Sequence, residues 1–297
     1  MTNPTSSATL AALALAACAA ENGANPKTAE ARQAAAQAVA PQPATPGREW
    51  TTVDVAGRKV EMLISRPSLI GGVAIFGHGL GGAPGNYGRL IKALNDRGWL
   101  VVAPLNVDSL SYKGPRPRDE RAAFAARVAD QGAAADLARR LAPGQPVVAV
   151  GHSFGALIAS IKGGALANIA PARDPGVNAV LMFSSPGRIP GLSVPENFRT
   201  LAVPTMLVTG TQDIIPILLP DPRAHLTVVE GAPEGVATAL VVKGGGHNLT
   251  ERDTGRGRDA AVDAAMDFLD AYGRGDAAAL ARVEALRSDD RVEVRRS

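Results

Sequence analysis

The sequence predicts an α/β fold in which a mostly parallel sheet has helices on both faces. Two observations carry this prediction. Short apolar runs, typical of strands that are buried on both faces, recur between residues 73 and 208. Helix-compatible stretches lie between most of these runs, as expected for a parallel sheet. With 297 residues, of which 46% are hydrophobic, the chain can bury the core of one large domain.

The charge balance argues against a nucleic-acid partner. Lys and Arg number 31 and Asp and Glu number 28, which leaves a net charge of only +3. In the last stretch the basic residues alternate with acidic ones, a pattern typical of a solvated tail. We therefore expect no binding to nucleic acid.

The N-terminal segment carries the only cysteine, Cys18, at the end of an apolar run over residues 8–17. This run is too short to span a bilayer but suits an export signal. The letters LAAC at residues 15–18 resemble the lipobox of bacterial lipoproteins, whose cysteine becomes lipid-modified after cleavage. The resemblance implies a signal segment over residues 1–18 and a cell-envelope protein tethered to the membrane through Cys18. Because no Lys or Arg precedes Cys18, a cytoplasmic protein with a disordered leader is the alternative.

Residues 19–48 are predicted to form a flexible linker. They are rich in Ala, Pro, Gln and Asn and contain almost no large apolar side chains. Such a segment cannot offset its ordering entropy by burial. The folded domain is expected over residues 49–273, opening with a hairpin of two strands at 50–55 and 59–65. The polar residues 274–297 are predicted to form a frayed helix or a disordered tail.

Within the domain, strands and helices are expected to alternate. The strands are predicted at residues 73–76, 99–103, 147–150, 177–183, 205–208 and 239–243, and the helices at 87–97, 121–141, 157–162 and 259–272. In such sheets, ligands bind beyond the carboxyl ends of the strands. Residues that directly follow the strands are therefore the candidates for chemistry.

The strand at 147–150 is followed at once by GHSFG over residues 151–155, and then by a helix. This is the G-x-S-x-G turn in its strand-turn-helix context, and it makes Ser153 the candidate nucleophile. Gly151 and Gly155 are expected because the strand and helix backbones crowd there. Phe154 would offer a backbone N–H to an oxyanion at the start of the helix.

The strand at 73–76 runs into GHGLGG over residues 77–82. In hydrolases with a serine turn of this kind, the loop after an early strand supplies the second oxyanion donor, which we assign to the backbone N–H of Leu80. Gly79 and Gly81 would let this loop approach a substrate carbonyl closely. His78 is expected to orient the loop and not to carry protons.

The run from Val73 to Pro104 resembles a branch of the α/β-hydrolase superfamily. An HGxGG turn is followed there by a helix that ends in glycine and a strand that ends in Ala-Pro. This pattern is similar to the serine esterases related to dienelactone hydrolase, platelet-activating-factor acetylhydrolase and cutinase, and the likeness extends over about residues 51–272. It implies the α/β-hydrolase fold and esterase activity. Residues 105–112 depart from many relatives, so the resemblance does not imply a substrate.

The acid and the base of a catalytic triad are sought after the later strands. Asp213 follows the strand at 205–208, where relatives carry the acid that orients the histidine, whereas Asp108 and Asp221 are poorer candidates. His247 follows the last strand, and His225 precedes that strand. The order Ser153, Asp213, His247 is that of the α/β-hydrolases.

We therefore expect a carboxylic ester hydrolase that acts through an acyl-enzyme without a metal or an organic cofactor. A thioesterase, lactonase or perhydrolase would use the same residues, and a hydrolase-fold binding module without turnover is the non-enzymatic alternative. The short segment 184–202 leaves no room for a helical lid domain. An open site suggests short acyl chains or a bulky, surface-presented ester. The sequence indicates no oligomeric state.

Overall fold

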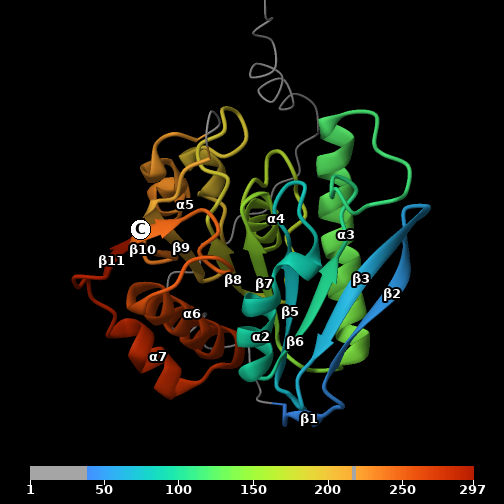
Figure 1. The fold of residues 1–297 in the computed structure, drawn as a ribbon, viewed down its shortest axis with the longest axis horizontal. Helices are drawn as coiled ribbons and strands as arrows, with labels where there is room; N and C mark the ends of the chain where they lie inside the picture. The colour runs from blue at the N-terminus through green and yellow to red at the C-terminus, as the bar shows by residue number, and fades with distance from the viewer. Residues whose placement is uncertain (1–38, 216–218) are drawn as a thin grey trace, which may run out of the picture.

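The computed structural model describes residues 39–215 and 219–297. Their centre is a nine-stranded sheet with the strand order β11-β10-β9-β8-β7-β5-β6-β3-β2 (Figure 1). The strands are β2 (Gly47–Val55), β3 (Arg58–Arg66), β5 (Gly72–Gly77), β6 (Trp99–Pro104), β7 (Val147–His152), β8 (Val177–Phe183), β9 (Thr205–Gln212), β10 (Ala237–Gly246) and β11 (Val292–Arg296). The six central strands from β6 to β10 run parallel, and β2, β3 and β11 are antiparallel to their neighbours.

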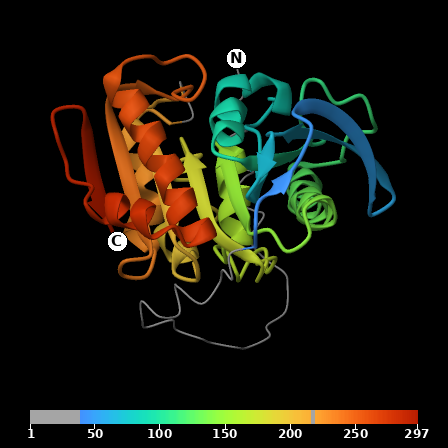
Figure 2. The same ribbon diagram turned by 90° about the horizontal axis from the view of Figure 1, so that it is seen from below.

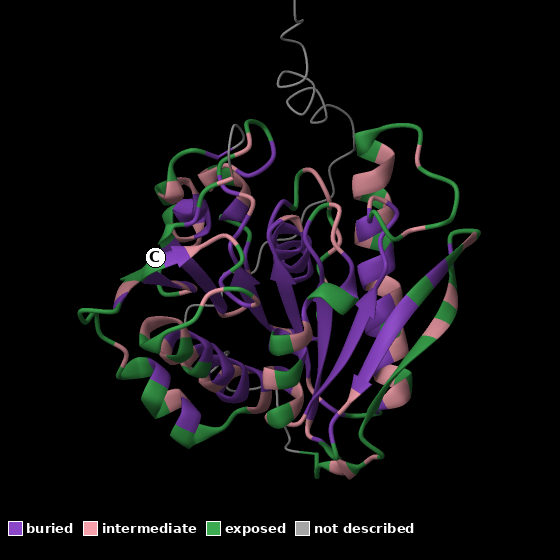
Figure 3. Ribbon diagram, in the orientation of Figure 1, coloured by how far each residue is buried: buried purple, intermediate pink, exposed green. Residues whose placement is uncertain are grey.

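Helices cover both faces of this sheet (Figure 2). The helices α3 and α4 pack on one face, and α2 and α6 pack on the other. The strands between them are buried almost throughout (Figure 3). The α-helices are α2 (Gly88–Asp96), α3 (Glu120–Leu141), α4 (Phe154–Lys162), α5 (Thr227–Gly231), α6 (Arg256–Arg274) and α7 (Ala277–Glu284). Short 3-10 helices are η2 (Pro84–Asn86), η3 (Pro195–Phe198) and η4 (Pro222–Leu226). The predicted fold class is therefore confirmed.

The strand order brings the candidate loops to one edge of the sheet. β5 and β7 are neighbours although β6 lies between them in sequence, and Gly77 at the end of β5 pairs with Gly151 at the end of β7. β9 and β10 are likewise adjacent, and Gln212 pairs with Gly246. Because parallel strands end at the same edge, the loops after all four strands gather in one place.

The C-terminal prediction was wrong, because residues 274–297 are folded onto the domain. They form α7 and then β11, which pairs antiparallel with β10 at the edge of the sheet. Val283 and Val292 are buried against the α2 and α6 face. The few apolar side chains of this polar segment are spaced so that they face the domain, which makes ordering favourable.

The predicted linker also becomes ordered earlier than expected. β1 (Gln42–Pro43) pairs with β4 (Leu69–Ile70), and the Gln145 side chain donates to the Ala40 carbonyl. These bonds are made by backbone groups of the linker, so the amino-acid composition of the linker does not predict them. Cys18 and the predicted signal segment lie outside the described residues. No helix of the described ranges is both long and apolar enough to cross a bilayer.

Candidate active site

Ser153 occupies a strained turn between β7 and α4. Its backbone angles, φ 54° and ψ −122°, lie where a residue with a side chain is rarely found. The Ser153 N–H donates to the carbonyl oxygen of Phe183 at 2.9 Å, which fixes the turn to the neighbouring strand β8. The side chain faces the main cavity of the structure, where the N-terminal end of α4 also points.

Two glycines make this turn possible. A Cβ atom on Gly151 would lie 2.2 Å from the Gly155 carbonyl oxygen. A Cβ atom on Gly155 would lie 2.1 Å from the carbonyl oxygen of Gly77 in β5. No real Cβ atom approaches backbone so closely, so the strand and helix backbones can meet here only through glycine.

The structure brings Ser153, Asp213 and His247 into one hydrogen-bonded chain. The Nδ1 atom of His247 lies 2.7 Å from Asp213 Oδ1, and its Nε2 atom lies 3.0 Å from Ser153 Oγ. A neutral His247 with its proton on Nδ1 donates to the carboxylate and leaves Nε2 free to accept the serine proton. This is the arrangement in which a histidine activates a serine for attack.

Asp213 is fully buried at the end of β9. Its Oδ2 atom accepts a hydrogen bond of 2.7 Å from the Thr209 hydroxyl, and its Oδ1 atom is shared by His247 and His225. Burial alone would raise the pKa of the Asp213 carboxyl. The hydrogen bonds from His225 and His247 outweigh burial and hold this pKa well below its usual range, so the carboxyl is ionised.

His225, the other histidine considered as a base, lies behind the acid and not beside the serine. Its Nδ1 atom bonds to the Ser185 carbonyl oxygen, and its Nε2 atom lies 2.9 Å from both the backbone oxygen and Oδ1 of Asp213. Both ring nitrogens therefore face oxygen atoms of the protein, which fixes the position of the ring. The ring stacks on that of His247 with centroids 5.9 Å apart. Nothing local in the sequence indicates this contact with the acid.

The predicted oxyanion donors lie on two sides of Ser153. Leu80 and Phe154 line the same cavity as the serine. Within the described residues, neither backbone N–H donates to another protein group. Both N–H groups are thus available to a substrate oxygen. Leu80 as a whole is 67% exposed, so burial of its side chain does not hold it in place.

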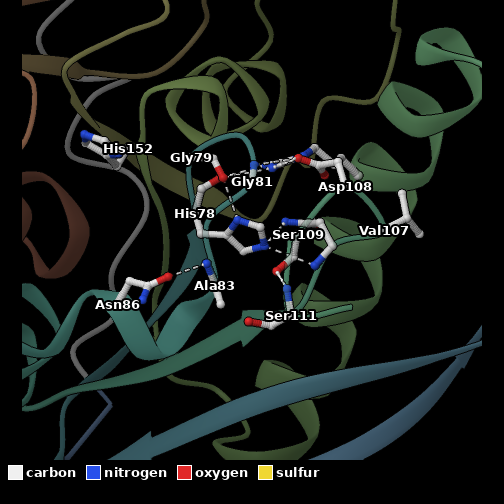
Figure 4. A network of polar contacts seen from close by, with 12 residues as sticks. His78, Gly79, Gly81, Ala83, Asn86, Val107, Asp108, Ser109, Ser111 and His152 are labelled. Carbon is white, nitrogen blue, oxygen red and sulfur yellow. Dashed lines mark hydrogen bonds and ion pairs between the residues drawn. The ribbon is translucent and has the colours of Figure 1, made fainter. Parts of the chain in front are cut away.

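Arg127, which sequence reasoning missed, holds the loop that carries Leu80. This buried side chain of α3 donates to the carbonyl oxygens of His78 at 2.7 Å and Gly79 at 3.1 Å. It also forms a two-point ion pair with Asp108, with both N–O distances at 2.6 Å. Asp108 in turn accepts from the Gly81 N–H at 3.3 Å (Figure 4). The Gly79 N–H is held by Tyr87 and the Gly81 N–H by Asp108, so the Leu80 N–H between them is the one without a protein partner in the described residues.

Asp108 is therefore occupied by Arg127 and is not an acid partner for a histidine. Asp221 caps the start of η4 and lies on the surface. The one hint of the Arg127 contact in the sequence is an arginine within a helix that is otherwise rich in alanine. Neither aspartate contacts His247, so Asp213 alone takes the acid position.

His78 is buried in this loop. Figure 4 shows its ring among the polar contacts of the loop. Its Nδ1 atom donates to the Gly79 carbonyl oxygen at 2.7 Å, and its Nε2 atom accepts from the Asn106 backbone N–H at 3.1 Å. Burial, aided by the charge of Arg127, lowers the pKa of His78 to about 3. The geometry agrees with the expectation that His78 orients the loop.

Tyr87 and His152 connect three loops of the site. The Gly79 N–H donates to the Tyr87 hydroxyl, which lies 2.9 Å from His152 Nδ1. The Nε2 atom of His152 lies 2.7 Å from the His247 carbonyl oxygen. Burial lowers the pKa of His152 to about 4, so the ring is neutral and donates only through Nε2. Sequence reasoning gave neither residue a role, because their partners come from distant segments.

The cavity beside Ser153 has a volume of about 1630 Å³ and opens to solvent. Phe154 forms part of its wall with Phe124 of α3, and their ring centroids lie 6.1 Å apart. The wall is mainly apolar, and its polar residues include Ser153 and His247 as well as charged residues such as Asp108 and Lys162. Such a cavity can bind an apolar chain and hold a reactive carbonyl at one end.

Asp213, His225 and His247 also form a group whose ligand atoms lie within 4.8 Å of one another. A metal ion there would need the nitrogen atoms that now bond to Ser153, Ser185 and Asp213. The same atoms cannot serve both purposes, so these residues do not fit a resident metal in this arrangement.

Comparisons with known proteins agree with the observed fold. Residues 74–287 match the model of a family described as the alpha/beta hydrolase family. A dienelactone hydrolase from Anabaena variabilis has a similar fold, with a TM-score of 0.59 and 18% identity over 77% of this chain and 99% of that chain. An esterase from Pyrococcus furiosus has a TM-score of 0.58 and 15% identity over 77% of this chain and 94% of that one. No curated protein matches the chain.

Proposed function

The chain belongs to the alpha/beta hydrolase family, and from this premise we propose that it is a serine hydrolase that cleaves carboxylic esters through an acyl-enzyme on Ser153. The observation that carries the proposal is the chain of hydrogen bonds from Asp213 through His247 to Ser153. It ends at a serine in a strained turn beside an apolar cavity, which is where a nucleophile needs to be.

In the first half of the reaction, His247 Nε2 takes the proton of Ser153 while Oγ bonds to the ester carbonyl carbon. The carbonyl oxygen becomes negative and accepts hydrogen bonds from the N–H groups of Leu80 and Phe154. His247 then gives its proton to the departing alcohol as the carbon–oxygen bond breaks. Ser153 is left as an acyl ester.

In the second half, His247 takes a proton from water, and the oxygen of that water bonds to the acyl carbon. The bond to Ser153 Oγ then breaks, the serine recovers its proton from His247, and the carboxylic acid leaves. Asp213 keeps the His247 ring in one orientation and stabilises its charged form. The charge on Asp213 persists throughout, because its low pKa keeps it ionised.

Thioesters, lactones and peracid formation would use the same residues, and esters are favoured because similar folds belong to proteins named as esterases. A binding module without turnover is disfavoured because no group that this mechanism requires is missing. The Leu80 and Phe154 N–H groups, in particular, have no partner in the described chain and are free for an oxyanion.

The proposal is tested by labelling with a fluorophosphonate and by a panel of p-nitrophenyl esters from acetate to palmitate. We expect a label on Ser153 and hydrolysis that falls by at least about a thousandfold in Ser153→Ala. Asp213→Asn should lower kcat by about 10³- to 10⁴-fold, because the amide favours the wrong histidine tautomer. A label that persists in Ser153→Ala, or near-normal activity of Asp213→Asn, contradicts this assignment.

A further inference from the structure

The cavity continues from Ser153 along the space between α3 and α4. Small residues on one side of α3, spaced three or four positions apart, leave room for it: Ala125, Ala129 and Gly132. The loop over residues 168–172 lines the cavity as well. Lys162 at the end of α4 lines the same cavity as Ser153 at its beginning.

Lys162 is an unusual residue in the wall of a mainly apolar cavity, because it is charged and yet only 5% exposed. Its ammonium group makes no hydrogen bond and no ion pair with any residue of the ranges 39–215 and 219–297. The nearest acids, Asp136 and Asp174, both pair with Arg139, at 3.5 Å and 2.5 Å. Burial lowers the pKa of the Lys162 ammonium, as expected for a charge that lacks a partner.

A lysine at a helix end often extends along apolar surface and places its charge in bulk water beside the helix carbonyls. Lys162 does not fit that description. Its side chain lines the cavity, and a Cβ atom on Gly132 would lie 3.5 Å from its Nζ atom, so the ammonium lies against α3 at the cavity wall. Burial of most of the side chain weakens the hydration of this cation, and a ligand anion in the cavity would supply the partner that it lacks.

We propose that the cavity binds esters with one unbranched arm ending in a carboxylate, which pairs with Lys162 while the ester carbonyl lies at Ser153. This inference rests on the proposed esterase function and adds the substrate class. A carboxylate fits a single ammonium group better than a phosphate dianion does, because a dianion needs further cationic donors.

The length of that arm follows from the helix. A helix rises about 1.5 Å per residue, so the nine residues of α4 place Lys162 about 13 Å from Ser153 along the axis. The carboxylate ends about 3 Å short of the ammonium, which leaves about 10 Å to span. Three bonds of an extended chain span about 3.6 Å, so an arm of about eight or more carbons is needed. Shorter arms would leave their carboxylate in the apolar part of the cavity.

The test uses two ester series on the intact protein. One contains mono-p-nitrophenyl esters of dicarboxylic acids from succinate to dodecanedioate, and the other contains acetate esters of ω-hydroxy acids of similar lengths. Each is compared with the methyl-terminated ester of equal length as a ratio of kcat/KM values. Only the series whose carboxylate lies on the arm that enters the cavity should respond. In that series we expect the ratio of kcat/KM values to be below one for short arms and to rise about 10- to 100-fold at about eight carbons.

Lys162→Met should abolish this rise, whereas Lys92→Met, on the exposed side of α2, should leave it intact. A ratio that stays flat with length in the wild-type protein overturns the inference even if Lys162→Met does not fold. Equal length profiles for the wild type and Lys162→Met overturn it as well. Turnover of methyl-terminated esters and labelling of Ser153 report separately on the proposed function, so the two failures are distinguishable.

Discussion

At the scale of single residues, the carboxylate of Asp213 accepts hydrogen bonds from three side chains. Thr209 and His225 hold it from behind, and His247 approaches from the side of the serine. An acid that has only one partner can rotate away from it. With three donors its position is fixed, and the position of the His247 ring is fixed with it.

His225→Leu is therefore expected to lower kcat by about 10- to 100-fold with little change in KM, because the residue positions the acid and lies away from the substrate. The buried Ser185 carbonyl would also lose its donor, which should lower the free energy of unfolding by about 1–3 kcal/mol. Steady-state kinetics and urea denaturation measure both effects. His225→Gln keeps an amide donor and should lose less. An unchanged kcat in the leucine variant would show that Asp213 needs no such support.

The three residues that the structure joins by hydrogen bonds could be predicted from the sequence, but the residues that contact them from behind could not. Ser153, Asp213 and His247 each directly follow a strand, which is a local signal. Arg127 and His225 act through contacts with segments 49 and 12 residues away. Such contacts depend on the tertiary fold, and they produce no characteristic residue spacing in the sequence.

At the scale of elements, the strands buried on both faces were the most predictable, because both sides of each carry apolar residues. β11 was missed because it is an edge strand with one solvated side. Its sequence, VEVRR, offers only two apolar positions. Edge strands are held by backbone hydrogen bonds that any sequence can make, so hydrophobic patterning identifies them poorly.

Removal of residues 288–297 is expected to destabilise the protein, because β10 would lose the five residue pairs that cover its edge. We expect a lower Tm and self-association through the exposed strand, measured by thermal denaturation and light scattering. The substitution Glu293→Ala, which keeps the backbone bonds of β11, is the control and should remain monodisperse to the same extent as the wild type. A truncated protein with unchanged Tm would show that β11 contributes nothing to the sheet.

At the scale of the whole molecule, two buried neutral histidines make stability depend on pH. The folded pKa is about 3 for His78 and about 4 for His152, whereas an unfolded histidine titrates near 6.5. Below about pH 6.5 the unfolded chain binds protons that the folded chain does not, so the free energy of unfolding falls as the pH falls. The lowered pKa of Asp213 acts only in more acidic solution, below about pH 4.

Between about pH 7.5 and pH 5, each histidine should therefore lower the free energy of unfolding by about 2 kcal/mol, at about 1.36 kcal/mol per pH unit. Urea denaturation across this range measures the slope. His152→Gln removes one titrating group and should reduce the slope by about half. A stability that does not change over the range would mean that both histidines take up protons in the folded state.

The antiparallel pairing of β11 with β10 also has a consequence for synthesis on the ribosome. β10, which leads to His247, is translated before α6 and α7, and its outer edge can be covered only when β11 emerges. Because domains begin to fold while translation continues, the nascent chain passes through a stage with an open strand next to its reactive centre. A chaperone that binds extended segments would meet its substrate in that interval, and ribosomes that stall after α6 would release a chain prone to aggregation.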